Sequence, residues 1–488
     1  MTPDPIDSQI PRPVPDERDA GELMVVGVGA SAGGLGSLRQ FVAAIPLDSG
    51  MAFVVISRPD PKSAGGMRTL LQDSTVLPVT QVEGRTTVEA NHIYIRSSAD
   101  DLIIRGSTLG LRAKGARSER TPVDLFFRML AEAVGANAVG VVLSGTGADG
   151  TVGIRHIREA GGITIAQSPD EAEHGSMPSS AIETGLVDLV LPSSRIPAEL
   201  HRLRALPSRP ENPTPSTPET DIGLAKVIAT LRSRTGHDFS LYKRSLVLSR
   251  LDRRLRFNDT DTLDEYLPLL RSSSTECQAL LRDLLISVSS FFRDPEAFEA
   301  LSAQVPAFFE GKGPADTVRV WVVGCATGEE AYSIAMIISE HSATLDAPPR
   351  IQLFATDIDR NGYGWARAGL YDADAVSGIP PARLLRFFTK EPGGYRIDKS
   401  LRDLILFAGH NVLHDSPFSR IDLISCRNLF SYLQAEAQRQ LLETFHFALK
   451  PDGILLLGAS ESVGESARFA AATGSTQRLF HRLPAGGA

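Results

Sequence analysis

Apolar positions divide the chain into three regions with different periods. From Leu23, short apolar runs alternate with amphipathic stretches, which predicts a doubly wound, mainly parallel sheet. The pattern fades after Leu200, and from Ile222 to about Gly311 leucines recur at helical spacing. A second series of apolar runs begins near Val318. Strands are expected at residues 23–28, 52–56, 139–143 and 161–166, and then at 318–323, 351–355, 404–408, 421–425 and 454–457.

The stretches between these regions set the expected domain limits. Residues 1–22 are rich in Pro, Asp and Glu and poor in large apolar residues, so we expect a disordered leader. Prolines crowd residues 201–221, which indicates a semi-stiff linker. The predicted fold class is α/β, with two doubly wound, mainly parallel-sheet domains at 23–200 and 311–488. A small helical domain at 222–310 precedes the second, which is expected to be Rossmann-like.

Composition narrows the function classes. The 488 residues are 42% hydrophobic and 22% charged, as in an ordinary globular protein. A net charge of −8 argues against general nucleic-acid binding. The three cysteines, Cys277, Cys325 and Cys426, have no Cys-x-x-Cys spacing, so neither a metal site nor a disulfide framework is expected. No apolar run approaches the roughly 20 residues that span a bilayer, and no signal peptide is evident. We expect a cytoplasmic protein without membrane insertion.

The stretch Val320–Glu330 reads as a buried strand, a glycine turn and the start of a helix. The turn has neither the dinucleotide nor the P-loop pattern. Two acidic residues directly after Gly328 would repel a pyrophosphate, which favours a ligand with hydroxyls or positive charge, such as S-adenosylmethionine. Asp357 ends the next predicted strand, where a carboxylate accepts hydrogen bonds from ribose hydroxyls. A capping aspartate is the alternative interpretation.

The first α/β domain has its own candidate site. The stretch Gly29-Ala30-Ser31-Ala32-Gly33-Gly34 leaves a strand and opens a helix, as a nucleophile elbow does. A second glycine-rich loop, Leu143–Gly150, also follows a strand. An ordinary glycine-rich turn is the alternative for either loop.

With Gly161–Gln167 and Met177–Ile182, these motifs make residues 23–200 resemble the methylesterase domain of the chemotaxis receptor-demethylating enzymes. That family hydrolyses glutamate methyl esters with a Ser–His–Asp triad. The resemblance places the serine at Ser31, the aspartate at Asp149 and the histidine position at Arg58.

Arginine stays protonated and cannot take the serine proton, and loss of a triad histidine can cost on the order of 10⁶ in turnover. We therefore expect weak or absent esterase activity, with Arg58 paired to Asp149 or bound to a carboxylate. Nothing in the sequence places His92, His156 or His174 beside the serine.

Residues 222–484 resemble the chemotaxis receptor glutamate methyltransferases. The resemblance rests on the blocks Ser289–Asp294, Trp321–Ser333, Ala355–Asp359, His410–Val412 and Cys426–Asn428, with Tyr432. The whole chain is similar to fused forms of the two enzymes. This implies S-adenosylmethionine-dependent O-methylation of glutamates on chemoreceptor helices, with the esterase-like domain as a docking or regulatory module. A bifunctional enzyme, a different methyl acceptor and a non-enzymatic cofactor-binding scaffold are the alternatives.

The resemblance also implies individual roles. Cofactor contacts are expected from Ser287, Ser289, Arg293, Gly324, Gly328, Glu329, Glu330, Asp357, Asn411, Val412, Asn428 and Leu429. Arg293 and Tyr432 are expected near the reacting centre, although a surface salt bridge and a core tyrosine are their alternatives. The basic stripe between Lys243 and Arg256 is expected to face the receptor through Arg250 and Arg256, although such stripes are usually solvated faces. Residues 365–403 are expected to form the family's small β insert.

Overall fold

The structure is a computed structural model that describes residues 23–31, 33–57, 66–96, 100–112, 121–205, 217–285, 289–371, 375–391, 394–464, 466–472 and 478–484. The chain forms two compact units, Met1–Ser208 and Arg209–Ala488. Arg58 and Ser287 lie outside the described residues, as do the expected leader and residues 206–216 of the expected linker. Helix α6 (Ile196–Ala205) extends into that linker, and helix α7 begins at Pro218.

The first unit is built on a seven-stranded sheet in which every neighbouring pair is parallel. Its order is β10 (Leu189–Leu191), β9 (Ile163–Gln167), β8 (Ala138–Val142), β1 (Val25–Ala30), β2 (Ala52–Ser57), β5 (His92–Arg96) and β3 (Val79–Val82). The chain turns in opposite directions on the two sides of β1. The carboxyl ends of β1 and β8 therefore form a topological switch point, where ligands bind in such sheets.

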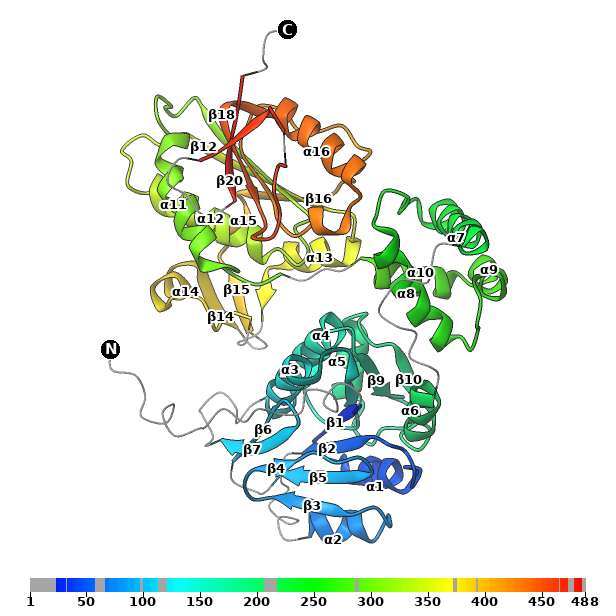
Figure 1. Ribbon diagram of the computed structural model, residues 1–488. Coiled ribbons are helices and arrows are strands. Elements are labelled where there is room, and N and C mark those ends of the chain that lie inside the picture. The colour runs from blue at the N-terminus through cyan, green and yellow to red at the C-terminus, as the bar shows by residue number, and fades with distance from the viewer. Residues whose placement is uncertain are drawn as a thin grey trace. The chain divides into compact units, whose positions relative to one another are not determined.

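Successive residues of β1 face opposite layers of helices (Figure 1). Val25 packs with α3 (Pro122–Val134), α4 (Thr151–Glu159) and α5 (Ser176–Glu183), whereas Val26 packs with α1 (Leu35–Ala43), α2 (Met67–Gln72) and α6. A short 3₁₀ turn, η1 (Gly135–Asn137), precedes β8. A small antiparallel sheet contains β4 (Thr86–Thr87), β7 (Thr108–Arg112) and β6 (Asp101–Arg105). The pattern of apolar residues did not predict this sheet.

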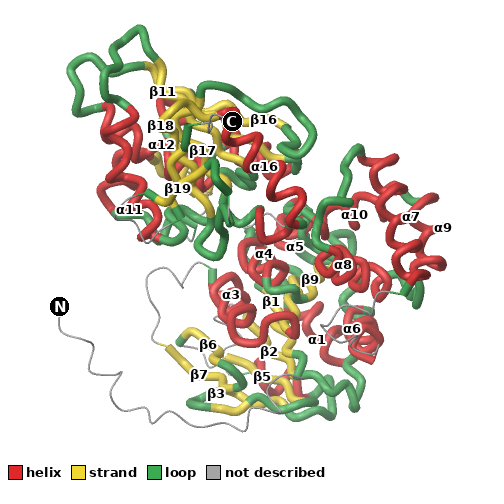
Figure 2. The backbone as a smooth tube through the Cα atoms, turned by 45° about the horizontal axis from the view of Figure 1, so that its top comes forward, coloured by secondary structure: helices red, strands yellow, loops and turns green. Residues whose placement is uncertain are grey.

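The second unit begins with four helices, which are drawn in red in Figure 2. They are α7 (Pro218–Thr235), α8 (Arg244–Phe257), α9 (Leu263–Ser272) and α10 (Ser274–Leu284). Three of them start at a hydroxyl cap: the side chains of Thr217, Thr262 and Ser273 accept hydrogen bonds from backbone N–H groups at 3.1–3.2 Å. Their leucines form one shared core.

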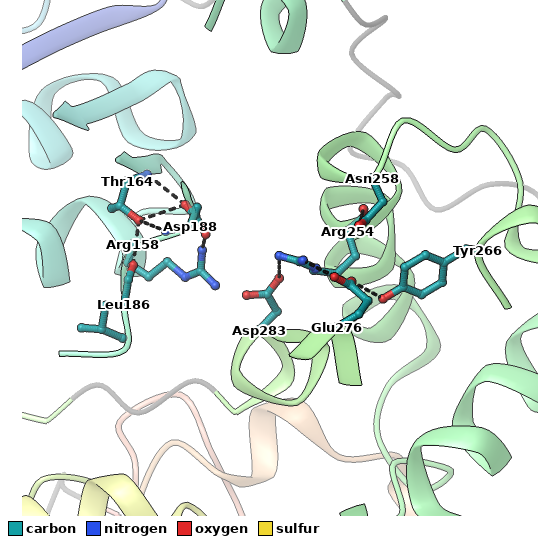
Figure 3. A network of polar contacts seen from close by, with 9 residues as sticks. All are labelled: Arg158, Thr164, Leu186, Asp188, Arg254, Asn258, Tyr266, Glu276 and Asp283. Atoms are coloured by element: carbon teal, nitrogen blue, oxygen red, sulfur yellow. Dashed lines mark hydrogen bonds and ion pairs between the residues drawn. The ribbon is translucent and has the colours of Figure 1, made fainter. Parts of the chain in front are cut away.

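A buried ion-pair network crosses this helical core (Figure 3). Arg254 donates two hydrogen bonds to Glu276, at 2.8 and 2.6 Å, and Tyr266 donates a third to the same carboxylate at 2.6 Å. Arg254 is only 8% exposed, and Arg253 is 9% exposed. Arg253 and Arg254 therefore do not belong to an exposed basic stripe, because α8 turns them inward. Arg256, one of the two residues predicted to meet the receptor, is exposed. In the first unit, Figure 3 also shows Asp188 with its partners Thr164 and Arg158.

The second sheet has the order β16 (Ile405–Gly409), β12 (Arg350–Asp357), β11 (Thr317–Val323), β17 (Ile421–Cys426), β18 (Leu449–Leu457), β20 (Leu479–Arg482) and β19 (Phe469–Ala471). Neighbours from β16 to β18 are parallel, and β20 is antiparallel to β18 and β19. The direction of winding reverses at β11, which places a second switch point at the carboxyl ends of β11 and β17.

Helices cover both faces of this sheet. Val320 packs with α11 (Pro295–Gln304) and α12 (Glu329–Ser342), and Trp321 packs with α16 (Ala435–Ala448). Helix α11 and the following η2 (Val305–Phe308) belong to this core, so by packing the helical subdomain ends before residue 295 rather than at 310.

The expected insert follows α13 (Arg360–Ala368) and contains β13 (Leu370–Tyr371), α14 (Pro381–Phe387), β14 (Phe388–Glu391) and β15 (Gly394–Ile397), with α15 (Lys399–Arg402) after it (Figure 1). Across the described residues of both units, every helix is too short or too polar to cross a membrane.

Candidate methyltransferase site

The turn after β11 is held by the end of β12. The N–H of Ala326 donates to Asp357 Oδ2 at 2.8 Å, and the N–H of Asp359 donates to Asp357 Oδ1 at 2.8 Å. Gly324, Ala326 and Gly328 all have left-handed backbones, with φ of +68°, +46° and +93°. A Cβ on Gly324 would meet nothing within 4 Å, whereas one on Gly328 would lie 2.6 Å from Ala366 Cβ. Gly324 therefore faces open space, and Gly328 packs against α13.

Burial raises the pKa of Asp357 to about 6, while hydrogen bonds from the backbone N–H groups of Asp359, Ala326 and Ile358 act to lower it. The charge of Asp357 also contributes, after burial, to raising the pKa of the Tyr242 phenol to about 12. Tyr242 belongs to the helical subdomain, and it packs both against the helical core and against the core between the second sheet and α16. The ribose-binding candidate therefore lies where the two subdomains meet.

The two acidic residues after Gly328 have different surroundings. Glu329 is 1% exposed and accepts hydrogen bonds from the Thr327 hydroxyl at 2.9 and 2.7 Å, so its carboxylate closes the turn. Glu330 accepts from Ser425 Oγ at 2.8 Å and from Arg427 Nη1 at 3.3 Å, both at the end of β17. Burial raises the pKa of Glu330, and Arg427 opposes that shift. Of the two expected ligands, Glu330 is the one directed to the strand ends.

Arg293 sits in a strained turn tied to the same cluster. Its neighbours Phe292 and Asp294 both have left-handed backbones, with φ of +51° and +58°, a conformation that costs about 1–3 kcal/mol for such residues. Arg427 Nη2 donates to the Arg293 carbonyl at 2.8 Å and to Asp294 at 2.6 Å. The positive charge of Arg293 acts on the Glu330 carboxylate, favouring its ionised form.

Tyr432 is joined to the helical subdomain. It ends η3 (Phe430–Tyr432), and its carbonyl accepts a hydrogen bond from the Lys243 N–H at 2.8 Å. The Gln434 side chain donates to the carbonyls of Ser240 and Tyr242 at 3.0 and 2.9 Å. Arg250 lies within electrostatic reach of Tyr432, and burial lowers the pKa of its guanidinium. Arg256 instead pairs with Asp252 on its own helix, at 3.3 Å.

Most of the remaining expected contacts follow the carboxyl ends of β16 and β17. Asn411 follows β16, and the N–H of the preceding His410 donates a hydrogen bond to the Asp357 carbonyl at 3.1 Å. The side-chain oxygen of Asn411 accepts a hydrogen bond from the Leu413 N–H at 3.1 Å. Asn428 follows β17 in a left-handed conformation, with φ of +65°. Val412, Leu429 and Ser289 are each partly buried.

The first unit retains the geometry of a serine turn at its own switch point. Ser31 is 8% exposed, and its Oγ accepts a hydrogen bond from the Thr146 N–H at 2.8 Å. A Cβ on Gly145 would lie 2.4 Å from that oxygen, so the second loop approaches the serine closely. Asp149 accepts hydrogen bonds from the N–H groups of Val123 and Asp124 at 3.1–3.3 Å, at the start of α3.

The three histidines considered as substitutes are in different places. His92 stacks on Tyr94 at the start of β5, away from the carboxyl ends of the strands. His156 lies on α4 beside Glu159, at 3.5 Å. The ring of His174 is exposed and lies against Gly33, two residues after the serine. None of these three positions identifies a histidine that takes the place of the triad base.

The site at β11 fits S-adenosylmethionine. Gly324 leaves room at the strand end, and the carboxylates of Asp357 and Glu330 both act on the neighbouring Cys325 thiol, adding to the rise in pKa that burial gives it. Hydroxyl donors and a cationic group are what two such carboxylates accept. The sequence motifs did not predict Arg427 and Ser425 as site residues, although Arg427 lies in the motif Cys426–Asn428. Glu461 was not predicted either, because its loop matches none of the motifs that carry the resemblance.

Fold and site together define a Rossmann-like methyltransferase with an attached methylesterase-like domain. Residues 287–478 match the family described as "CheR methyltransferase, SAM binding domain", residues 222–285 its all-alpha domain, and residues 26–200 the CheB methylesterase family. The chemotaxis protein methyltransferase of Escherichia coli K12 is 33% identical over 254 residues, which cover 50% of this chain and 85% of that protein. The chain belongs to the chemotaxis protein methyltransferase family, in a form fused to a methylesterase-family domain.

Two further proteins are similar to parts of this chain. An uncharacterized 104.1 kDa protein of Rhodobacter capsulatus is 35% identical over 445 residues, which cover 86% of this chain. The chain spans about half the length of that relative, 47%. The crystal structure of the Thermotoga maritima CheB methylesterase catalytic domain matches 37% of this chain and 98% of its own, with 27% identity and a TM-score of 0.35.

Proposed function

We propose that the second unit transfers a methyl group from S-adenosylmethionine to glutamate side chains on chemoreceptor-like helices. The observation that supports this most strongly is the turn at the end of β11, where Gly324 faces open space and the carboxylates of Asp357 and Glu330 are held at the neighbouring strand ends. Family membership supports the same cofactor and acceptor class.

The reaction asks for alignment rather than proton transfer. When bound, the cofactor supplies a methyl group on a positively charged sulfur. The acceptor glutamate, with an ordinary pKa of about 4.3, is already ionised at pH 7 and needs no general base. The chain's residues therefore hold the acceptor oxygen in line and exclude water, and such positioning can supply roughly 7–11 kcal/mol.

We assign roles to the described residues from the family resemblance. Asp357 accepts hydrogen bonds from the ribose hydroxyls, and Glu330 binds the cationic amino end of the cofactor, with Gly324 and Gly328 shaping the turn beside it. Asn411, Val412, Asn428 and Leu429 border the adenine. Ser289 supplies a hydroxyl near the cofactor. Arg293 and Tyr432 act at the acceptor carboxylate, and Arg250 with Arg256 meets the acidic receptor helix, which charge attraction favours.

The direct test is methyl transfer from labelled S-adenosylmethionine to the helical cytoplasmic part of candidate receptors. We expect label that is released by mild base, as an ester is. Asp357→Ala should weaken cofactor binding by about tenfold or more, because hydrogen bonds to a charged group are worth about 1.5–3 kcal/mol each. Arg293→Ala should lower turnover more than cofactor affinity. Base-stable label would indicate a different acceptor, and cofactor binding without transfer to any receptor would favour a signalling scaffold.

We further propose that the first unit has little methylesterase activity and serves as a docking or regulatory module. The observation that supports this is that Arg58 stands at the triad histidine position, and an arginine stays protonated and cannot accept the serine proton. Methanol release from methylated receptor should be slow and unchanged in Ser31→Ala. A rate typical of methylesterases that Ser31→Ala abolishes would establish the bifunctional alternative instead.

A further inference from the structure

Glu461 is a buried carboxylate at the edge of the proposed methyltransferase site. It is 4% exposed and lies in the loop that follows β18. Its Oε2 accepts hydrogen bonds from the N–H groups of Asn428 and Gly458, at 2.9 and 2.8 Å. Its Oε1 accepts a third, from the Ser431 N–H at 3.1 Å. One side chain thus joins the carboxyl ends of β17 and β18.

The segment that Glu461 holds is the one that carries Asn428 and Tyr432. Asn428 has a left-handed backbone, with φ of +65°, which asparagine tolerates better than most residues. A Cβ on Gly458 would lie 2.8 Å from Asn428 Oδ1, so the two strand ends approach closely. Ser431 is the residue before Tyr432 in η3. The carboxylate therefore fixes both ends of the turn 428–432.

We propose that Glu461 is a positioning residue for methyl transfer: it sets the turn 428–432 and, through it, the place of Tyr432 opposite the acceptor. This inference rests on the proposed function of the second unit.

The three donors require a carboxylate rather than an amide. Glutamine has only one acceptor oxygen. That oxygen can keep the Asn428 and Gly458 hydrogen bonds, but the amide nitrogen then faces the Ser431 N–H, donor against donor. Glu461→Gln should therefore displace Ser431 and Tyr432 while leaving Asn428 in place.

The experiment compares Glu461→Gln with Asp422→Asn in the full chain. Asp422 is a matched control, because it is 6% exposed, sits near the start of β17 and binds Lys312, Lys450 and the Arg319 N–H. For Glu461→Gln we expect kcat to fall about 10-fold to 100-fold, as a displacement of about 1 Å can produce, with the cofactor Kd changed less than about threefold. Asp422→Asn should lower the Tm without this separation of kcat from Kd.

A second arm tests whether Glu461 acts through Tyr432. In a Tyr432→Phe background, Glu461→Gln should lower kcat much less than it does in the wild type, because the two losses are coupled. Hydrogen exchange should become faster at the amides of Ser431 and Tyr432, and it should stay unchanged at Asn428, whose hydrogen bond is kept, and in β17.

Three results would overturn the proposal. The first is a kcat of Glu461→Gln within about twofold of wild type, and the second is unchanged hydrogen exchange at Ser431 and Tyr432. The third is a loss of kcat and cofactor affinity together, in proportion to the fall in Tm, as in Asp422→Asn. If the wild-type chain transfers no methyl group at all, the proposed function fails separately, and exchange at 428–432 still decides whether Glu461 sets the turn.

Discussion

Left-handed backbone conformations gather around the proposed methyltransferase site. Phe292 and Asp294 flank Arg293, Ala326 lies in the turn after β11, and Asn428 follows β17. Each such conformation persists only where its surroundings hold it. For three of them the surrounding contacts are hydrogen bonds to buried or partly buried side chains: Ser333 for the N–H of Phe292, Asp357 for that of Ala326 and Glu461 for that of Asn428. The strain therefore marks a constructed site rather than a loose loop.

Three glycines with similar backbones allow the effect of conformation to be separated from the effect of space. Gly311, Gly324 and Gly328 have φ of +69°, +68° and +93°. Alanine at each should carry a similar conformational cost of about 1–3 kcal/mol, because a side chain disfavours positive φ. Of the three, Gly328→Ala alone should lower the free energy of unfolding beyond this cost, because its Cβ would lie 2.6 Å from the Cβ of Ala366.

Gly324→Ala should fold like Gly311→Ala but lose cofactor affinity, because its Cβ enters the space left for the ligand. Thermal unfolding and calorimetric titration with S-adenosylmethionine distinguish these outcomes. Equal cofactor affinity in Gly324→Ala and Gly311→Ala would contradict the location of the site.

The pKa of Asp357 predicts a pH dependence of cofactor binding. Its folded-state pKa of about 6 lies above the ordinary value of 3.8, so ionisation of this group opposes folding at neutral pH. That opposition declines as the pH falls below about 6 and is gone below 3.8, the ordinary pKa. Binding has the opposite dependence, because ribose hydroxyls need the ionised acceptor. The Kd for S-adenosylmethionine should rise as the pH falls below about 6, approaching tenfold per unit.

Titrations at several pH values check this expectation. Asp357→Asn should bind more weakly at pH 7.5 and show a flatter profile. Glu330→Gln is the necessary companion, since burial also raises the pKa of Glu330. A profile that stays steep in Asp357→Asn and flattens in Glu330→Gln would assign the dependence to Glu330.

The helices and strands were the more predictable level. Every expected strand is present, with ends displaced by a few residues, because apolar runs between glycine turns are a strong local signal. The burial of Arg254 was not predicted from the sequence, since the periodicity of α8 reveals nothing of its partners Glu276 and Tyr266 on other helices. The different roles of Glu329 and Glu330 were not predictable either. Which of the two side chains meets the end of β17 depends on how α12 packs against that strand, and this packing is not visible in the local sequence.

Helix α8 offers a matched pair of arginines that separates folding from receptor contact. Arg254→Ala leaves Glu276 buried without its partner, which should cost about 3–5 kcal/mol and unfold the helical subdomain. Arg256→Ala removes an exposed charge whose pair with Asp252 is worth about 0–1 kcal/mol. Arg256→Ala should therefore leave the Tm nearly unchanged while raising the KM for receptor, most clearly at low salt. Chemical unfolding and receptor titrations check both. A receptor KM that does not change in Arg256→Ala would remove this residue from the contact surface.

At the scale of the whole molecule, two units with separate sheets and separate cores carry two switch-point sites. Each sheet brings together loops that are distant in sequence: Ser31 meets Thr146 in the first unit, and the turn after β11 meets the ends of β12 and β17 in the second. The sequence motifs identified these loops correctly as strand ends. They did not reveal the contacts of Tyr242, Lys243 and Gln434, which attach the helical subdomain to the second site.

The separateness of the units gives the last prediction. All of the contacts described for Asp357, Glu330, Arg427, Glu461 and Gln434 lie within residues 209–488. A fragment of residues 209–488 should therefore fold and bind S-adenosylmethionine with a Kd within about threefold of the full chain, because it loses none of these contacts. Labelled methyl transfer by the fragment, the full chain and full-length Ser31→Ala should then show what the first unit adds. Similar cofactor affinity with a higher receptor KM in the fragment alone would assign receptor docking to the first unit. A folded fragment whose cofactor affinity falls by more than about tenfold, or 1.4 kcal/mol, would mean that the methyltransferase site requires the esterase-like domain.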